Sequence, residues 1–600
     1  MNKDEIIKEL SKIQKEIIEL PIGYISKKNI NNKIRFYLQW VEDGKKKSKY
    51  IDESIVDKLS ADIEKRRELK KKEKELSLML LKNDDVKIQK EGISSFKTNV
   101  IIGENLKNFV QIVAKYKKRN LYKDICDYVY GEIQDKVFIL YGLRRTGKTT
   151  LIRQVILNMD EEDFSKTAFI QVTDGINLAD INNDLKFLLN NGYKYVFIDE
   201  VTLIDDFIEG AALFSDIFAA CGMKIILSGT DSLGFYFSQD DQLYDRSIFV
   251  HTTFIPYKEF EEVLGIKGID EYICYGGTMS FDGKHYNEKS IFANKKSVDE
   301  YVDSAIAKNI QHSLKCYQYG GHFRELYFLY EKNELTSAIN RVIEDVNHYF
   351  TLDVLTRDFV SHDLGISAKN LRNDRQNPND ILDRIDNKQF VERLKDMLEI
   401  RNKSEQTITI SDESRREIKE YLDALDLTVD IDIQTLPVGK TNTFKTIFTQ
   451  PGMRYSQAKE LVQSLLMDSE FQNLSIEERN EIIERILNEI KGRMMEDIVL
   501  LETKVANPKK QVFKLQFSVG EFDMVVANNT DLTCEIYEIK HSKEKTEEQY
   551  RHLIDEEKLK NTEFRYGKIT KRAVIYRGDD AVLENGIKYI NVEEYLKSFN

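Results

Sequence analysis

The sequence predicts an α/β protein of several domains, and three observations support this prediction. Apolar runs of strand length alternate with helical patterns over residues 136–260, as in a parallel sheet covered by helices on both faces. Further strand-like runs between residues 512 and 540 precede a helix and indicate a second α/β unit. The chain has 600 residues, of which 41% are apolar, and this is enough to bury several cores.

Composition limits the class of protein. The net charge is −13, so any contact with nucleic acid must be local rather than a result of overall charge. The five cysteines are far apart and form no C-x-x-C pair, which argues against a zinc site and a disulfide framework. No stretch approaches the ~20 apolar residues of a membrane span. We therefore expect a cytoplasmic protein that does not enter a membrane.

Residues 1–85 are expected to form a small N-terminal α+β unit with a helix and β-hairpins. Its aromatic-rich segments, such as residues 34–41, are separated by turn sequences at residues 31–32 and 42–44. The lysine run 45–47 has aromatic neighbours, a combination that can contact phosphates and stack on bases. The alternative, which we favour, is a solvated lysine turn on a small sheet.

The domain at residues 136–260 is expected to follow a helical adaptor over residues 86–135. Its strand 137–141 leads into Gly142-x4-Gly147-Lys148-Thr149, and a helical pattern comes directly after. In this context backbone N–H groups and a helix N-terminus converge on phosphate oxygens. Lys148 would reach the β- and γ-phosphates, and Thr149 would bind Mg²⁺. The residues expected to bind ATP here are Gly142, Arg145, Thr146, Gly147, Lys148, Thr149 and Thr150.

Polar side chains follow the next strands of this domain. The strand 193–198 ends in Asp199 and Glu200, at the edge where ligands of parallel sheets bind. Asp199 would hold Mg²⁺ together with Thr149, and Glu200 would orient and polarise the attacking water. Ser228 or Thr230, after the strand 224–227, would sense the γ-phosphate. Arg246 is the candidate for stabilising transition-state charge, with an ordinary surface arginine as the equal alternative.

Four segments of this domain resemble prokaryotic AAA-type P-loop ATPases. They are residues 142–149, 197–200, 228–230 and 255–260. The resemblance implies a helical or winged-helix-like region next, expected over residues 261–450, and then a restriction-endonuclease-like domain over residues 451–600. Tyr275-Gly276-Gly277 is similar to the family's step between domains. Residues 361–367 resemble the turn of a helix-turn-helix, although we favour a structural linker there.

The C-terminal region carries a second candidate site. Period-two geometry places Glu538 and Lys540 on one face of a strand, and a hairpin can bring Asp523 beside them. Two carboxylates and a lysine suit metal-assisted phosphodiester hydrolysis. Asp523 and Glu538 would bind Mg²⁺, Lys540 would orient or activate the water, and Glu496 on the preceding helix would be a further metal ligand.

The order of these residues resembles the PD-(D/E)XK nucleases, with Phe522 where that family often has proline. The resemblance also implies a supporting role for Gln549 on the following helix. Relatives of this fold often keep the shape and lose the activity, so a nuclease-like fold is a firmer expectation than cleavage itself.

Two hypotheses follow. In the first, ATP binding and hydrolysis control a Mg²⁺-dependent nuclease that acts on DNA, in a role such as defence against mobile DNA. In the second, the protein is a nucleotide-dependent switch or scaffold whose C-terminal domain only binds DNA or a protein. The first is the leading hypothesis, because both groups of site residues are intact in one chain. The acidic charge and the lack of a basic tract near Asp523 motivate the second. A homo-oligomer, a protein partner and a monomer all remain open.

Overall fold

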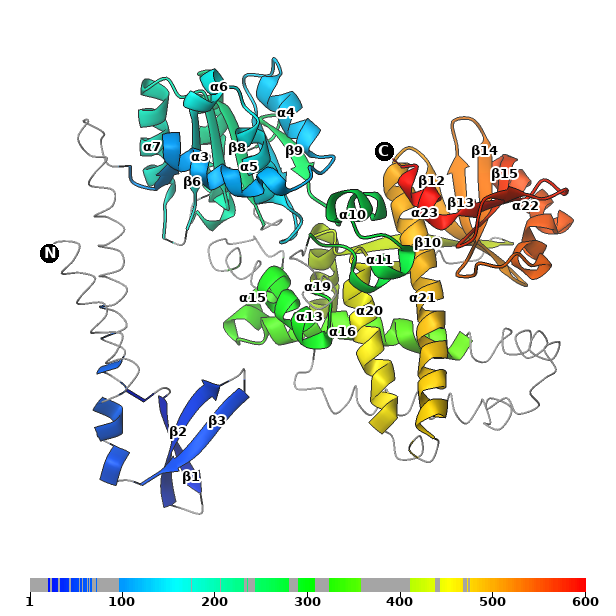
Figure 1. Ribbon diagram of the computed structural model, residues 1–600, viewed down its shortest axis with the longest axis horizontal. Helices are drawn as coiled ribbons and strands as arrows, with labels where there is room; N and C mark the ends of the chain where they lie inside the picture. Colours follow the sequence, from blue (N-terminus) through cyan, green and yellow to red (C-terminus); the bar gives the residue numbers. More distant parts are fainter. Residues whose placement is uncertain are drawn as a thin grey trace. The chain divides into compact units, whose positions relative to one another are not determined.

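The protein is described here from a computed structural model (Figure 1). The described residues are 20–21, 24–30, 33–42, 45–52, 54–56, 58–61, 63, 65–66, 69, 72, 96–173, 175–204, 207–230, 235, 243–279, 290–307, 314, 323–357, 410–437, 443–467, 472 and 475–599. The expected N-terminal helix before residue 20 and the expected turn at residues 361–367 lie outside them. The chain divides into two compact units, Met1–Phe96 and Lys97–Asn600.

The first unit contains a three-stranded antiparallel sheet. Its strands are the aromatic-rich segments of the sequence, β1 (Tyr24–Ile30), β2 (Lys33–Glu42) and β3 (Lys45–Ile51). In the register of β2 and β3, Trp40 pairs with Lys47 and Tyr37 pairs with Tyr50. The lysine run 45–47 therefore begins a strand instead of forming a turn.

The second unit begins with a six-stranded sheet in the order β4-β6-β7-β8-β5-β9. All neighbouring strands are parallel except the edge pair β4 and β6. The strands are β4 (Asn99–Ile101), β5 (Val137–Tyr141), β6 (Thr167–Gln171), β7 (Tyr195–Asp199), β8 (Lys224–Gly229) and β9 (Ser247–His251). Because β8 lies between β5 and β7, the carboxyl ends of these three strands meet at one edge.

Helices cover both faces of this sheet, which explains why its central strands are continuously apolar and buried. The helical segments are α3 (Gly103–Gln111), η1 (Ile112–Lys115), α4 (Tyr122–Tyr130), α5 (Lys148–Leu157), α6 (Glu161–Ser165), α7 (Leu178–Asn190), η2 (Val201–Leu203), α8 (Phe207–Gly210) and η3 (Phe214–Ala219). Buried side chains of α3, α4 and α5 form one core with β5 and β6.

A helical region follows the six-stranded sheet. Its segments are α10 (Tyr257–Leu264), α11 (Ile269–Tyr275), α13 (Lys295–Tyr301), η4 (Val302–Ala307), α15 (Arg324–Glu331), α16 (Leu335–Arg357) and α19 (Asp412–Ala424). Gly276 and Gly277 end α11 where the chain packs closely, since a Cβ at Gly277 would lie 2.6 Å from Gln450 Cα. Within the described residues, no helix has both the length and the apolar character needed to cross a membrane.

The C-terminal part is an eight-stranded mixed sheet in the order β11-β10-β12-β13-β14-β15-β17-β16. Its strands are β10 (Thr428–Leu436), β11 (Thr443–Phe448), β12 (Gln511–Phe517), β13 (Glu521–Asn528), β14 (Thr533–Lys540), β15 (Lys568–Tyr576), β16 (Ala581–Val582) and β17 (Lys588–Asn591). The boundary expected at residue 451 therefore falls too late, because β10 pairs in parallel with β12, far along the chain.

Helices lie on the two faces of this sheet (Figure 1). They are α21 (Ile476–Ala506), η8 (Glu547–Ile554), α22 (Glu556–Tyr566) and α23 (Val592–Lys597), while α20 (Pro451–Gln463) packs against α11 and α21 and leads into η6 (Ser464–Met467). Tyr537 and Ile539 of β14 pack in the core formed with α21, while Ile536 packs with Leu553 of η8. Side chains alternate along a strand, so Glu538 and Lys540 continue the face that η8 and α22 cover.

Candidate functional site

The loop between β5 and α5 has a backbone that only particular residues can adopt. Gly142 and Gly147 have φ values of 134° and 89°. A Cβ at Gly142 would lie 2.4 Å from the carbonyl oxygen of Thr252, so no side chain fits there. Thr146 closes the loop by donating from Oγ1 to Leu143 O at 2.8 Å. Arg145 is exposed in the loop and Thr150 lies half-buried in the first turn of α5.

Lys148 folds back across this loop. Its Nζ donates to the carbonyl oxygens of Gly142 and Leu143, each at 2.7 Å. Burial lowers the pKa of Lys148 to about 8, while the charges of Glu200 and Asp199 act in the opposite direction. An anionic oxygen would be a stronger acceptor than these carbonyls. The side chain is therefore suited to turn toward a phosphate.

Asp199 is the centre of a group of oxygen atoms at the carboxyl ends of the strands. Thr149 Oγ1 donates to Asp199 Oδ2 at 2.8 Å, and Ser228 Oγ donates to Asp199 Oδ1. These residues come from α5, β7 and β8, which the strand order brings to one edge. Carboxylate and hydroxyl oxygens are the ligands that Mg²⁺ prefers.

Glu200 follows directly and adopts a left-handed backbone with a φ of 58°. Thr230 Oγ1 donates to Glu200 Oε2 at 3.1 Å, so Ser228 and Thr230 each contact a different carboxylate. Burial, and then the charge of Asp199, raise the pKa of Glu200. A carboxylate with a raised pKa is better able to accept a proton from water.

Arg246 does not lie at this site, which corrects the expectation that it stabilises charge there within the chain. It precedes β9, and its carbonyl oxygen accepts a hydrogen bond from Val137 N at 3.0 Å, at the start of β5. The phosphate loop follows the opposite end of β5. Arg246 Nε lies 2.7 Å from Asp216 Oδ1 on the surface. The parallel alignment of β5 and β9 separates the arginine from the loop by the length of a strand.

Sequence reasoning missed a buried ion pair that supports the phosphate loop. Arg119 Nη1 donates to Thr146 O at 2.6 Å, and Arg119 Nε lies 2.6 Å from Glu259 Oε2. Glu259 Oε1 also accepts from Asn120 N at 2.6 Å. Arg119 lies in the region expected to be an adaptor without chemistry. No local pattern indicates a pairing between residues so far apart in the chain.

The segment with α10 and α11 contacts both the phosphate loop and the C-terminal sheet. On the loop side, Glu259 of α10 holds Arg119, and Met279 N donates to Arg145 O at 2.8 Å. On the other side, Tyr257 N donates to Glu502 Oε1 of α21 at 2.8 Å.

Asp270 of α11 makes a second contact with the C-terminal sheet. Its Oδ1 lies 2.9 Å from His541 Nε2, and its Oδ2 accepts from Arg577. The hydrogen bond with His541 lowers the pKa of Asp270 to about 2, against the effect of partial burial. His541 directly follows Lys540, so α11 is anchored beside the second candidate site.

At that second site, Lys540 joins the two predicted carboxylates. Its Nζ lies 2.8 Å from both Asp523 Oδ2 and Glu538 Oε2. Asp523 Oδ2 also accepts from Ile539 N at 2.8 Å. The expectation that these three side chains converge from β13 and β14 is therefore met by their geometry.

The two carboxylates have opposite pKa shifts. Burial raises the pKa of Glu538, and the charge of Lys540 only partly offsets it. Burial acts the same way on Asp523 and is the largest single effect, but the charges of Lys540 and Lys514 and the hydrogen bond from Ile539 N together outweigh it, and the pKa is lowered. Within the described residues, Glu538 Oε1 is buried and has no hydrogen-bond partner. A buried carboxylate oxygen without a protein partner is available to a bound ion.

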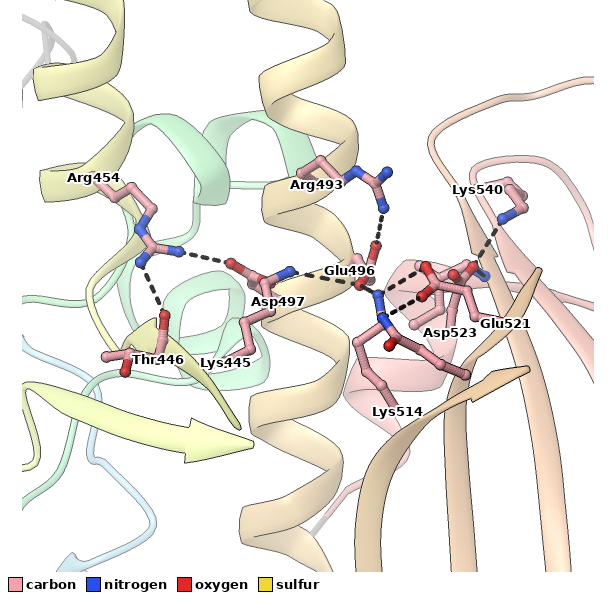
Figure 2. Close-up of polar contacts among 12 residues, drawn as sticks. Lys445, Thr446, Arg454, Arg493, Glu496, Asp497, Lys514, Glu521, Asp523 and Lys540 are labelled. Atoms are coloured by element: carbon pink, nitrogen blue, oxygen red, sulfur yellow. Dashed lines mark hydrogen bonds and ion pairs between the residues drawn. The ribbon is translucent and has the colours of Figure 1, made fainter. Parts of the chain in front are cut away.

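Basic side chains hold both carboxylate oxygens of Glu496 (Figure 2). Lys514 Nζ binds Glu496 Oε1, while Arg493 Nη1 lies 3.1 Å from Oε2 and Lys445 Nζ lies 3.6 Å from Oε1. Among the residues that the structure describes, no three acidic, imidazole or thiol groups gather as metal ligands. This arrangement argues against the expectation that Glu496 is a third metal ligand, because three basic side chains already bind its oxygens, whereas Glu538 keeps an oxygen without a partner.

Gln549 does not support the site either. Its Oε1 accepts from Thr546 N at 3.3 Å and from the Tyr589 hydroxyl at 3.1 Å, and its Nε2 donates to Glu544 O at 2.9 Å. These bonds cap the start of η8. The glutamine is therefore structural here.

Comparison with known proteins gives the following matches. Residues 134–261 match the family model described as AAA domain. Uncharacterized protein MJ1544 of Methanocaldococcus jannaschii is 24% identical over 205 residues, which cover 30% of this chain and 44% of that protein. This chain thus spans less than half the length of that relative. The solved structure of the Aeropyrum pernix Orc1 protein in complex with DNA aligns at 12% identity with a TM-score of 0.20, over 58% of this chain and 93% of that one.

Proposed function

We propose that this chain, whose residues 134–261 match an AAA domain, binds and hydrolyses ATP and uses its nucleotide state to control a C-terminal DNA nuclease. The AAA-type P-loop domain supports nucleotide binding and hydrolysis. Control of a nuclease and the Mg²⁺ dependence are the further steps of the proposal.

The observation that carries the first step is the group around Asp199. Thr149 and Asp199 would hold Mg²⁺, and the fit rests on the carboxylate and hydroxyl oxygens already in contact there. The ion would neutralise charge on the β- and γ-phosphates. Lys148 would leave the loop carbonyls for the phosphates, and Glu200, oriented by Thr230, would position the attacking water.

The second step rests on Asp523, Glu538 and Lys540. Asp523 and Glu538 would hold Mg²⁺, and the unpartnered Glu538 Oε1 fits such a ligand. The ion would polarise a phosphodiester oxygen. Lys540, released from the carboxylates by the ion's charge, would orient the water. Along the chain, helix α21 precedes the hairpin β13–β14, and η8 follows it. This order of helix, hairpin and helix supports a restriction-endonuclease-like domain.

The third step, control by nucleotide, rests on α10 and α11. The Arg119–Glu259 pair ties the phosphate loop to α10, and Tyr257 ties α10 to Glu502 on α21. Asp270 ties α11 to His541 beside Lys540. A loop that moves when it binds phosphate would therefore transmit the movement to both sides of the second site. This arrangement would suit defence against mobile DNA.

The test is cleavage of plasmid and linear DNA with Mg²⁺, with and without ATP, measured in parallel with ATP turnover. We expect Lys148→Ala to abolish ATP turnover and Lys540→Ala to abolish cleavage while ATP turnover continues. Lys560→Ala is the matched control, because that lysine is exposed and, among the residues that the structure describes, pairs with Glu556 alone on its own helix. Undiminished cleavage by Lys540→Ala would refute the site.

The second candidate function is a nucleotide-dependent switch whose C-terminal domain only binds DNA or a protein. The compensated charge of Glu496 favours it, because it leaves only two carboxylates to hold an ion. Two results together would establish this candidate over the nuclease. The protein would cleave DNA in no condition, and its affinity for DNA would differ between ATP and ADP.

A further inference from the structure

A buried lysine that neither candidate site uses lies beside the C-terminal site. Lys558 of α22 is 8% exposed. Its Nζ lies 2.6 Å from His552 Nδ1, and Asp555 Oδ2 is 4.0 Å away. A buried ammonium is usually paired with a carboxylate at hydrogen-bond distance. Here the partner at that distance is an imidazole.

The imidazole cannot satisfy the groups that face it. Lys558 donates toward Nδ1, and Arg551 Nε lies 3.4 Å from Nε2 on the other side of the ring. A neutral imidazole has only one acceptor nitrogen. Burial, and then the charges of Lys558, Arg551 and Lys540, lower the pKa of His552 to about 4, so the ring is neutral. Arg551 also pairs with Glu548 at 3.1 Å, so Lys558 is the cation whose partner at hydrogen-bond distance, among the described residues, is the imidazole alone. An anion would be a better acceptor for that ammonium than the ring.

The cluster faces the predicted catalytic residues. Lys558 and His552 come from α22 and η8, which cover the face of β14 that carries Glu538 and Lys540. The charge of Glu538 acts on Lys558, and the charges of Lys540 and Asp523 act on His552. Leu553, next to His552, packs in one core with Ile536, which lies two residues before Glu538 on that face.

The turn before β13 passes directly against the pair. Gly520 has a φ of 80°, and a Cβ there would lie 2.4 Å from His552 Cε1 and 3.0 Å from Lys558 Nζ. The positive φ favours glycine, and a side chain there would displace the imidazole of His552. Gly520 directly precedes β13, so the turn that touches the pair leads into the strand that carries Asp523.

We propose that Lys558, together with His552, binds a backbone phosphate of a DNA strand adjacent to the phosphodiester addressed by Asp523, Glu538 and Lys540. Lys558 Nζ donates to the phosphate oxygens and keeps His552 as a second partner. This inference rests on the proposed action on DNA. It adds a subsite that fixes the position of the strand and takes no part in bond breaking.

The test measures DNA binding by the full chain, by fluorescence anisotropy, with Ca²⁺ in place of Mg²⁺ so that binding is separated from cleavage. We expect Lys558→Met to weaken binding about fivefold or more and to reduce the slope of log affinity against log salt by about one. Lys560→Met, on the exposed face of the same helix, should leave both quantities unchanged.

Unchanged affinity and salt slope in Lys558→Met would overturn the subsite, and so would a wild-type chain that does not bind DNA. If Lys558→Met does not fold, His552→Ala takes its place, with a smaller loss of affinity expected because Lys558 remains. Loss of cleavage in Lys540→Ala tests the proposed function separately. A binding defect in Lys558→Met without any cleavage by the wild type would sink the nuclease and keep the subsite.

Discussion

Glu502 offers a quantitative test of the contact between α10 and α21. Its side chain is 4% exposed, and its Oε1 accepts from Tyr257 N at 2.8 Å. Burial raises its pKa from 4.5 to about 8, although the bonds from Tyr257 and Tyr272 act to lower it. Replacement by glutamine keeps an acceptor for Tyr257 and removes the ability to ionise.

The sign of the effect follows from proton binding. Below pH 4.5 the carboxyl is protonated in both the folded and the unfolded chain. Between 4.5 and about 8 the unfolded chain has released the proton and the folded chain still binds it. The free energy of unfolding therefore falls as the pH rises, by at most about 1.4 kcal/mol per pH unit, or about 5 kcal/mol over the interval.

The assay compares melting temperatures of the wild type and Glu502→Gln at pH 5 and pH 8. We expect nearly equal values at pH 5 and a variant that is more stable by several degrees at pH 8, since about 1 kcal/mol corresponds to about 2–4 °C for 150–250 residues and to less for a unit as large as Lys97–Asn600. A difference in melting temperature that is the same at both pH values would refute the reasoning. Glu593→Gln is a suitable control, because its contact with α11 is partly exposed.

Three further predictions concern the nucleotide site. Glu200→Gln should keep ATP binding and lower turnover by about a hundredfold or more, because the base that positions the water is lost; phosphate release and nucleotide binding measure this. Arg246→Ala should leave ATP turnover unchanged, and a large loss would show that the arginine reaches a nucleotide after all. Arg119→Met should destabilise the chain by about 3–5 kcal/mol, because Glu259 is left buried and unpaired. Recovery of melting temperature on adding Glu259→Gln would attribute that loss to the ion pair.

The phosphate loop could be predicted because its information is local. A strand, two glycines at fixed spacing and a following helix are all read within about fifteen residues, and the backbone angles of Gly142 and Gly147 require those residues. Asp199 and Glu200 could be predicted for the same reason, since they end a strand. The hydrogen bond between Ser228 and Asp199 could not be predicted without knowing the strand order, in which β8 lies between β5 and β7.

The C-terminal site could be predicted in part. Because side chains alternate along β14, Glu538 and Lys540 lie on one face of that strand. The hairpin of β13 and β14 brings Asp523 next to them. Glu496 was assigned from its order in the sequence, which does not reveal that Lys514, Arg493 and Lys445 surround it. Lys558 and Gln549 both lie after β14, and only packing decided that Lys558 contacts His552 while Gln549 caps η8.

The sequence by itself determined the α/β class, the phosphate loop, and the two groups of acidic residues, because each depends on residues close together in the chain. The tertiary structure decided which distant groups meet: Arg119 with Glu259, Tyr257 with Glu502, and Asp270 with His541. It also placed Arg246 at the wrong end of its sheet for a role at the phosphates. The physical reason is that buried charges require partners, and the order of strands and the packing of helices select those partners without regard to distance along the chain.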